Sequence, residues 1–271
     1  MFTCVDIFIK FLSPVLPVGQ ILIAFGTGTA AMFWLMASRT RQPILDKRYF
    51  HRATIFRCIS EMVGGLALVV ALSNSALSTV TAIMQTAPLV LTIMAAVFLK
   101  EVIGVSRIAA IIFGFLGVLI IIRPSAGELD IYAVCALVGV IGLAGRDFSA
   151  RLLPDDVSVI GLSFYGSLFV ILSGLLLMIV TGGWVLPNSK EIFYCVAMAA
   201  CGGVGLWCMS TSIRLADVSA VSPYRYTRII FGMVAGVIIF DEKIDVLTIF
   251  GALIIVGAGL YGWSRERIHS V

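Results

Sequence analysis

Long apolar stretches, separated by short polar or charged segments, follow one another through almost the whole of this chain. Nine of them are long enough to cross the roughly 30 Å hydrocarbon core of a bilayer, which takes about 20 helical residues. They cover approximately residues 17–37, 51–72, 76–99, 104–122, 130–152, 157–180, 191–214, 218–240 and 246–263. A shorter apolar stretch, Phe2 to Leu12, precedes them. The pattern predicts an all-α integral membrane protein.

The chain also matches itself at an offset of 141 residues. The aligned pairs include Asp6 with Asp147, Lys10 with Arg151, Gly64 with Gly205, Thr86 with Thr227 and Glu101 with Glu242. Residues 1–12 align with 142–153, the later part of a full-length stretch. We therefore predict ten transmembrane helices in two five-helix repeats, residues 1–124 and 125–271, with the first helix short or truncated. An alternative is nine helices and a re-entrant first segment.

Because each predicted repeat has five helices, the second repeat should enter the membrane upside down relative to the first. If the N-terminus is cytoplasmic, the cytoplasmic connections carry Arg39, Arg41, Lys47, Arg48, Arg52, Lys100, Arg107, Arg151, Arg214, Arg265 and Arg267. The outer connections carry only Arg123, Lys190 and Lys243. This positive-inside bias predicts that both termini are cytoplasmic, in a membrane that we expect to be a bacterial inner (plasma) membrane.

Composition excludes several other classes of protein. The chain is 60% hydrophobic and 13% charged, with a mean hydropathy of +1.08, whereas a soluble domain has about 25% charged residues. Its net charge of +4 is not clustered on one basic face, so we expect no nucleic-acid partner. The cysteines lack CxxC spacing, and the two histidines lie at the ends of apolar segments. We therefore expect no metal site and no cofactor.

Eight charged residues lie inside the apolar stretches, where each costs about 2.5–3.5 kcal/mol to insert. They are Asp6, Lys10, Arg57, Glu61, Arg146, Asp147, Arg225 and Arg228. The pairs Asp6/Lys10, Arg57/Glu61 and Asp147/Arg151 are four residues apart, which places each pair on one helical face. We interpret such pairs as internal ion pairs. The predicted coupling or gating residues are Glu61, Asp147, Arg146, Asp6 and Lys10, with Glu61 and Asp147 as candidate proton sites.

Arg225 and Arg228 differ from the other charges because their repeat partners, Met84 and Ala87, are apolar. Pro88 and Pro223 each leave a helical carbonyl unpaired near this depth, which is typical of transporter sites. The predicted substrate-binding residues are Arg225, Arg228, Tyr224, Tyr226, Gln85, Trp207 and Arg57. Among the eight charges five are basic, and this excess favours an anionic or zwitterionic solute. The aromatic residues are expected either to stack on the solute or to belong to an interfacial belt.

The ends of the two repeats carry a family resemblance. They read ALSTVTAIMQTAPLVLTIMAAVFLKEVIGVSRIAAIIFGFLGVLIIIRP and ADVSAVSPYRYTRIIFGMVAGVIIFDEKIDVLTIFGALIIVGAGLYGW, and the opening reads FTCVDIFIKFLS. Over essentially its whole length the chain resembles EamA-type members of the drug/metabolite transporter superfamily. The resemblance implies inverted repeats around a cavity that opens alternately to each side. It implies no particular substrate, because the superfamily includes carriers of amino acids, nucleotide sugars, vitamins, S-adenosylmethionine and drugs.

These observations predict a secondary transporter of an organic anion or amino-acid-like solute, acting as a monomer or homodimer. A riboflavin-like vitamin importer and a drug or metabolite exporter of the same superfamily are the alternatives. An intramembrane enzyme would need paired aspartates without adjacent cations, or a serine with a histidine, so we expect no catalytic residues. A channel would normally assemble its pore from several subunits. An inverted repeat within one chain therefore argues against a channel.

Overall fold

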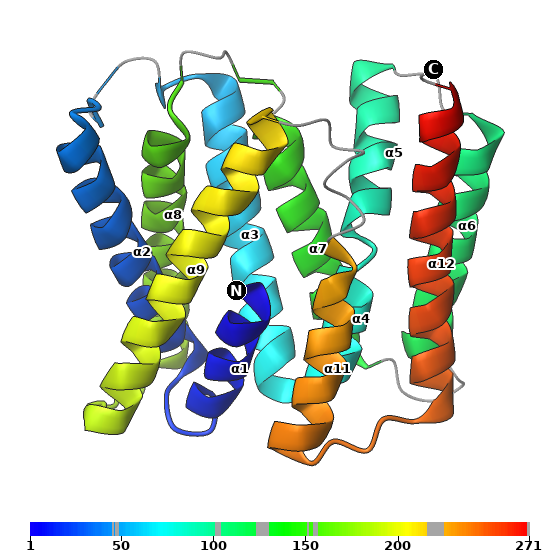
Figure 1. Ribbon diagram of the computed structural model, residues 1–271. Coiled ribbons are helices and arrows are strands. Elements are labelled where there is room, and N and C mark those ends of the chain that lie inside the picture. Colours follow the sequence, from blue (N-terminus) through cyan, green and yellow to red (C-terminus); the bar gives the residue numbers. More distant parts are fainter. Residues whose placement is uncertain are drawn as a thin grey trace.

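The computed structural model describes residues 1–44, 46, 49–100, 104–122, 130–150, 152–153, 157–215 and 225–269, with side chains up to 212 and up to 264 in the last two ranges. These residues form a helical bundle with no strand among them (Figure 1). The helices are α1 (Phe2–Leu12), α2 (Val18–Thr40), α3 (Arg52–Asn74), α4 (Leu77–Met84), α5 (Ala87–Leu99), α6 (Val105–Ile122), α7 (Ile131–Ala150), α8 (Val159–Thr181), α9 (Ser189–Leu215), α11 (Thr227–Phe240) and α12 (Val246–His269).

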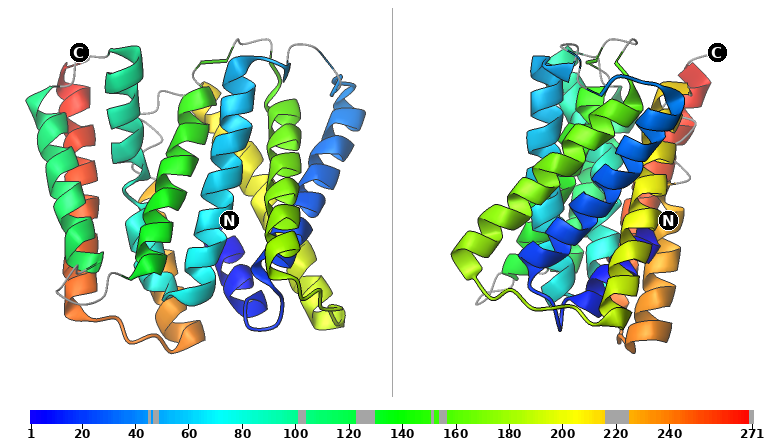
Figure 2. Two further views of the ribbon diagram at one scale, coloured as in Figure 1. Left: turned by 180° about the vertical axis from the view of Figure 1, so that it is seen from behind. Right: turned by 90° about the vertical axis from the view of Figure 1, so that its left-hand side faces the viewer.

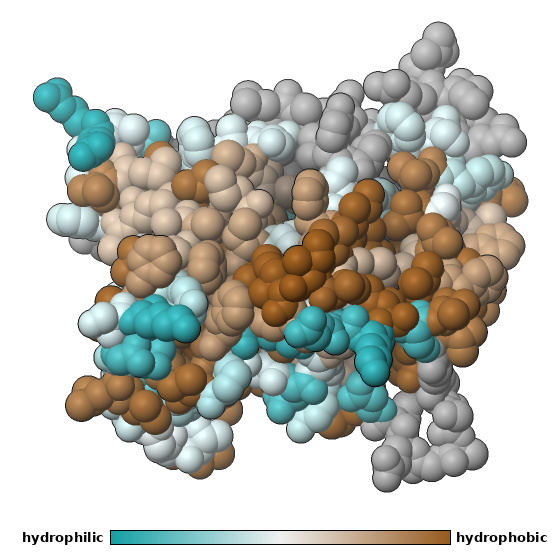
Figure 3. All heavy atoms as spheres, turned by 60° about the horizontal axis from the view of Figure 1, so that its bottom comes forward, coloured by the Kyte–Doolittle hydropathy of each residue, from teal (hydrophilic) through white to brown (hydrophobic). Residues whose placement is uncertain are grey.

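The apolar stretches of the sequence become membrane-length helices. Within the described ranges, eight segments are long and apolar enough to cross a membrane, with α4 and α5 counted as one span, and α11 is a shorter apolar helix. Apolar side chains such as Ile179, Val180 and Phe113 are exposed. In Figure 3 apolar residues cover much of the surface, while hydrophilic ones gather at the loop end turned forward. Such a surface is stable only in lipid, so the predicted integral membrane fold is confirmed.

Helices that the 141-residue offset pairs run in opposite directions (Figure 1). α2 spans Val18–Thr40 and α8 spans Val159–Thr181, so their ends coincide under the offset. In Figure 1 α2 runs upward and α8 downward, while α6 runs downward and its counterpart α12 upward. The views in Figure 2 show the same antiparallel arrangement. The predicted inverted architecture is therefore confirmed, and α1, with 11 residues, is its short first helix.

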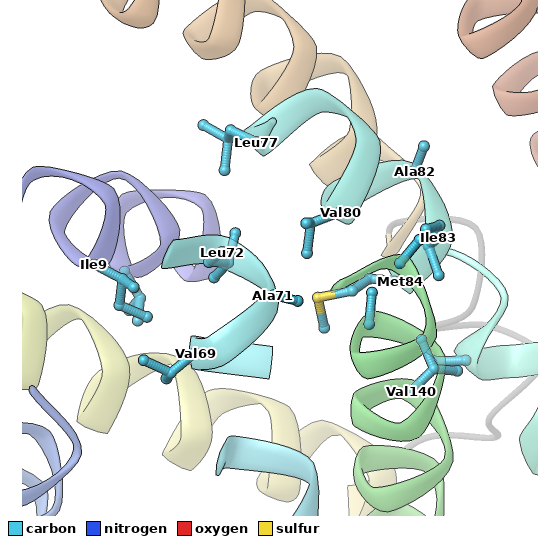
Figure 4. Close-up of a cluster of buried hydrophobic side chains, with 14 of the residues drawn as sticks. Ile9, Val69, Ala71, Leu72, Leu77, Val80, Ala82, Ile83, Met84 and Val140 are labelled. Carbon is cyan, nitrogen blue, oxygen red and sulfur yellow. The ribbon is translucent and has the colours of Figure 1, made fainter. Parts of the chain in front are cut away.

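The two sets of helices pack closely, with α3 against α7, α2 against α8 and α6 against α12. Where α3 and α7 meet, a Cβ atom added to Gly142 would lie 2.5 Å from the Cα atom of Gly64, so only glycine allows this approach. The buried core continues through α3, α4 and α7. Figure 4 shows Ala71, Val80 and Met84 pointing toward one another there.

The stretch predicted as one helix over 76–99 is interrupted. α4 ends at Met84 and α5 begins at Ala87, and the N–H groups of Gln85 and Thr86 donate to carbonyls three residues earlier. Pro88 follows in the first turn of α5, where it removes one further helical hydrogen bond. In the other repeat α11 begins at Thr227, the residue aligned with Thr86. The break after α4 and the start of α11 thus lie at aligned positions.

Candidate functional site

A cavity of about 440 Å³ lies among helices of both repeats. Residues of α1 to α5 line it together with residues of α7, α8, α9 and the segment 225–231. Most of the lining is apolar, and its polar members are Thr3, Asp6, Glu61, Gln85, Arg146, Ser212, Arg225, Thr227 and Arg228. A largely apolar cavity of this size with a few converging polar groups is typical of a small-molecule site. We call it the chamber.

Asp6 of α1 and Arg228 of α11 form an ion pair in the chamber wall. The Nη2 atom of Arg228 donates to both carboxylate oxygens of Asp6, at 2.8 and 2.6 Å, and its Nε donates to Oδ2 at 3.1 Å. Asp6 is almost fully buried, and the guanidinium lies 5.5 Å from the ring centroid of Phe2. This bidentate contact joins the first helix of one repeat to the fourth helix of the other.

Asp147 of α7 binds two arginines. The Nε and Nη2 atoms of Arg146 donate to its Oδ1 at 3.0 and 2.9 Å, and Nη2 of Arg225 donates to Oδ2 at 3.1 Å. Both carboxylate oxygens are therefore satisfied, although the residue is buried. Asp147 itself does not line the chamber, whereas both arginines do. The carboxylate fixes the position of two cationic lining residues.

Glu61 of α3 is bound much less completely. Its Oε1 lies 3.7 Å from Nη1 of Arg146, and its buried Oε2 has no hydrogen-bond partner within the described part of the chain. Oε2 instead packs against Gly166, where an added Cβ would lie 2.1 Å from it. Glu61 is 6% exposed and lines the chamber. It is thus a buried carboxyl group with one oxygen that accepts no hydrogen bond from the described residues.

Gln85 lies in the break between α4 and α5 and contacts the segment that precedes α11. Its Nε2 donates to the carbonyl oxygen of Arg225 at 2.7 Å. The side chain is 4% exposed and lines the chamber. Gln85 follows α4 and Arg225 precedes α11. This hydrogen bond therefore joins the break after α4 to the start of α11.

The ion pairs expected from four-residue spacing are not those of the structure. Asp6 binds Arg228 instead of Lys10, and Lys10 binds Glu242 at 2.8 Å. Arg57 donates to the carbonyl of Arg146 at 3.3 Å and to Ser210 Oγ at 3.5 Å, not to Glu61. A pair on one helix contributes only about 0.3–0.5 kcal/mol, so partners from other helices compete successfully. The third expected pair includes Arg151, which lies outside the described residues.

Glu242, just after α11, is a site residue for which the sequence suggested no role. It accepts hydrogen bonds from Lys10 Nζ (2.8 Å), Leu77 N (2.6 Å), Ser78 N (3.0 Å) and Ser78 Oγ (2.8 Å). Lys10 also donates to the Ser75 carbonyl at 2.7 Å. Burial raises the pKa of Glu242, but these hydrogen bonds outweigh it, and the pKa lies below its ordinary value. The carboxylate ties α1 and α11 to the N-terminus of α4.

The predicted substrate-binding residues separate into two groups. Arg225, Arg228 and Gln85 line the chamber. Tyr226 is 5% exposed and faces Gly259 of α12, while Trp207 is 40% exposed; neither lines the chamber. Arg57 is buried and does not line the chamber, and Tyr224 lies outside the described residues. The lining side chains that the sequence did not indicate are mainly apolar, and include Phe2, Phe25, Met84, Met198, Met209 and Phe231.

The charge of the chamber also differs from the excess of two expected for the whole set of intramembrane residues. Of its lining side chains, Arg146, Arg225 and Arg228 are basic and Asp6 and Glu61 are acidic, which leaves these side chains with an excess of one positive charge. Lys10 and Arg57, which belong to the predicted set, do not line the chamber. Among the described residues no three His, Cys, Asp or Glu side chains converge as metal ligands. The described chemistry of the chamber is therefore that of arginines and carboxylates in an apolar wall.

Comparison with known proteins places these features in a family. The model of the EamA-like transporter family matches residues 1–123 and 130–261. A curated S-adenosylmethionine uptake transporter of Rickettsia conorii is 25% identical over 190 residues, which are 70% of this chain and 64% of that protein. A riboflavin transporter of Brucella anthropi is 22% identical over 251 residues, 89% of this chain and 87% of that protein.

A solved structure described only as "Crystal structure of protein" matches with a TM-score of 0.70 and 14% identity, over 98% of this chain and 96% of that chain. At this identity the likeness concerns the fold alone.

Proposed function

The chain belongs to the EamA-like transporter family, and on that basis we propose that it is a secondary carrier of a small metabolite. The carrier moves its solute through the chamber by alternating access between the two inverted repeats. Arg225, Arg228 and Gln85 contact the solute, and Asp6, Lys10, Glu61, Arg146 and Asp147 serve coupling or gating. Residues 1–124 and 125–271 are the two moving halves.

The observation that supports this proposal most directly is the Asp6–Arg228 pair in the chamber wall. Both side chains are largely buried, and placing charges in a membrane protein interior is costly unless they are paired or functional. The pair joins a helix of one repeat to a helix of the other in the wall of the chamber. A solute that replaces one partner would therefore loosen a contact between the halves.

The chamber suits an amino-acid-like solute. A solute carboxylate would take one of the guanidinium groups of the chamber, and a solute cation would take the carboxylate of Asp6. The apolar lining, with Phe2, accommodates the rest of the molecule. S-adenosylmethionine, the solute in the name of one relative, carries such an amino-acid group and is our first probe.

Riboflavin is the second candidate. The relative named as a riboflavin transporter matches 89% of this chain. Phe2, Phe25 and Phe231 line the chamber, and a planar uncharged ring system can stack on such side chains. In this case the arginines would hydrogen-bond to carbonyl oxygens of the solute.

Counterflow into proteoliposomes tests the carrier and its solute together. Vesicles are preloaded with unlabelled S-adenosylmethionine or riboflavin, and entry of the labelled compound from a dilute outer solution is followed. We expect a transient overshoot with one of them, its loss in Arg228→Gln, and its retention in Arg39→Gln, because Arg39 is an exposed residue at the end of α2. Absence of counterflow with both compounds would contradict these solutes, and leakage without saturation would contradict a carrier.

We also propose that the end of the bundle at the top of Figure 1 is cytoplasmic. Arg39, Arg52 and Lys100 lie at this end, whereas Lys190 and Lys243 lie at the opposite one. A C-terminal fusion to a reporter that fluoresces only in the cytoplasm should be bright, and a dark fusion of a well-expressed protein would reverse the orientation.

A further inference from the structure

We propose that Glu61 carries a proton through the transport cycle and that its protonation favours binding of a solute carboxylate at Arg146. Proton and solute then move in the same direction. This proposal rests on the transport function above, but it identifies one side chain and a mechanism of coupling.

Glu61 lines the chamber with one incompletely hydrogen-bonded carboxyl group. The residue is 6% exposed, and Oε2 has no partner within the described part of the chain. Oε1 lies 3.7 Å from Arg146 Nη1, beyond the roughly 2.7–3.2 Å of a good hydrogen bond. A buried ionised carboxylate with an unused oxygen is costly. A bound proton removes that charge.

The other two buried carboxylates of this region, those of Asp6 and Asp147, have hydrogen bonds to both oxygens. Asp6 receives two nitrogen atoms of Arg228, and Asp147 receives hydrogen bonds from Arg146 and Arg225. Protonating either of them would leave an arginine buried without its partner, which costs several kcal/mol. Protonating Glu61 leaves Arg146 still bound to Asp147. Glu61 is therefore the carboxyl group that can change its charge at the smallest structural cost.

The groups around Glu61 come from four helices. α3 itself carries Arg57 and Cys58, α7 carries Arg146 and Asp147, α8 carries Tyr165 beside the contact at Gly166, and α1 contributes Asp6 to the same chamber. Arg57 and Arg146 favour the ionised carboxylate, and Asp6 and Asp147 oppose it. Arg57 donates to Ser210 and to the Arg146 carbonyl, although its Nε has no partner among the described residues, and Arg146 donates to Asp147. Nη1 of Arg146 approaches Oε1 of Glu61 at 3.7 Å.

This arrangement makes Arg146 Nη1 the point at which proton and solute interact. With Glu61 ionised, the side chains that line the chamber have an excess of one positive charge, and Nη1 is opposite a carboxylate of the protein. With Glu61 protonated, the excess becomes two, and a solute carboxylate can take Nη1 without repulsion. Binding linkage is reciprocal, so the solute also increases proton binding at Glu61. The carrier then moves loaded with both or with neither.

Transport with and without a proton gradient distinguishes this coupling from transport itself. Proteoliposomes with the membrane potential clamped receive labelled S-adenosylmethionine, either at equal pH or with an alkaline interior. For one pH unit, coupling of one proton per solute gives up to about tenfold accumulation. We expect this accumulation in the wild type and in Glu191→Gln, whose carboxylate lies at the exposed start of α9. Glu61→Gln should keep counterflow at equal pH and lose accumulation. Gradient-driven accumulation by Glu61→Gln would overturn the proposal.

A second measurement needs no solute, so it remains decisive if neither compound is transported. Infrared difference spectra between acidic and alkaline purified protein report protonated carboxyl groups. We expect a carboxylic-acid band that is present in the wild type and Glu191→Gln and lost in Glu61→Gln. If Glu61→Gln does not fold, Gly166→Ala replaces it, because the added Cβ would meet Oε2 and should shift the same band. A band unchanged in the folded variant, or no such band in the wild type, would overturn the proposal.

Discussion

Asp6 and Asp147 align under the repeat, yet each of them binds an arginine from the same short segment of the second repeat. Arg228 binds Asp6 with its shortest contact at 2.6 Å, and Arg225 binds Asp147 at 3.1 Å. The residues aligned with these arginines, Ala87 and Met84, are apolar. One segment at the start of α11 therefore contacts the acidic residues of both halves, and its movement would change both ion pairs together.

The Asp6–Arg228 pair should be revealed by a double-mutant cycle. Arg228→Gln leaves Asp6 ionised and buried, so we expect a loss of about 3 kcal/mol in the free energy of unfolding. Adding Asp6→Asn removes the unpaired charge and should restore most of that loss. Thermal unfolding of the detergent-solubilised variants, followed by size-exclusion chromatography, measures both effects. Losses that simply add in the double variant would show that the two residues do not interact.

Asp147 and Glu61 should differ in their structural importance. Asp147→Asn removes the carboxylate from the buried guanidinium of Arg146 and the partly buried one of Arg225, and we expect it to destabilise the protein by about 3 kcal/mol. Glu61→Gln disturbs one distant contact and should cost about 1 kcal/mol or less. The two melting temperatures, measured at the same pH and in the same detergent, test this order. Equal melting temperatures would contradict the assigned contacts.

The Lys10–Glu242 contact should make one end of the bundle sensitive to acid. The pKa of Glu242 is lower in the folded protein than its ordinary value, so its stabilising effect is present at neutral pH. That effect is lost as the pH falls below the ordinary glutamate value of about 4.3 and approaches the lower folded value. Glu242→Gln should remove about 2 kcal/mol at pH 7 and much less at low pH. Melting temperatures of both proteins across this pH range should converge; a constant difference would contradict the prediction.

The close approach of α3 and α7 should not tolerate a methyl group. A Cβ at position 142 would lie 2.5 Å from Gly64 Cα and 2.8 Å from the Ser60 carbonyl oxygen, both backbone atoms that cannot move aside. We expect Gly142→Ala to lower the melting temperature strongly or to abolish a monodisperse preparation. Gly257→Ala is the matched control, because a Cβ there meets nothing within 4 Å. Similar behaviour of the two variants would contradict this close packing.

Sequence reasoning was most successful where a structural property is local. Membrane-spanning length and hydropathy belong to individual segments, so the nine long stretches all correspond to helices in their described parts. It was less successful for side-chain direction. Arg225, Arg228 and Gln85 line the chamber, whereas Trp207 and Tyr226 do not. Which face of a membrane helix meets the cavity depends on how the helix is rotated by packing against its neighbours. The sequence of an apolar helix contains little information about this rotation.

By itself the sequence determined the medium, the repeat, the antiparallel sense of the halves and the small set of charges buried within them. Only the tertiary structure decided which charge binds which. Arg228 and Asp6 are 222 residues apart, and Lys10 and Glu242 are 232 apart. The physical reason is that partners on one helix gain little from each other, whereas guanidinium and carboxylate groups brought together by packing satisfy charges that lipid cannot solvate. The same packing left one oxygen of Glu61 without a hydrogen-bond partner among the described residues.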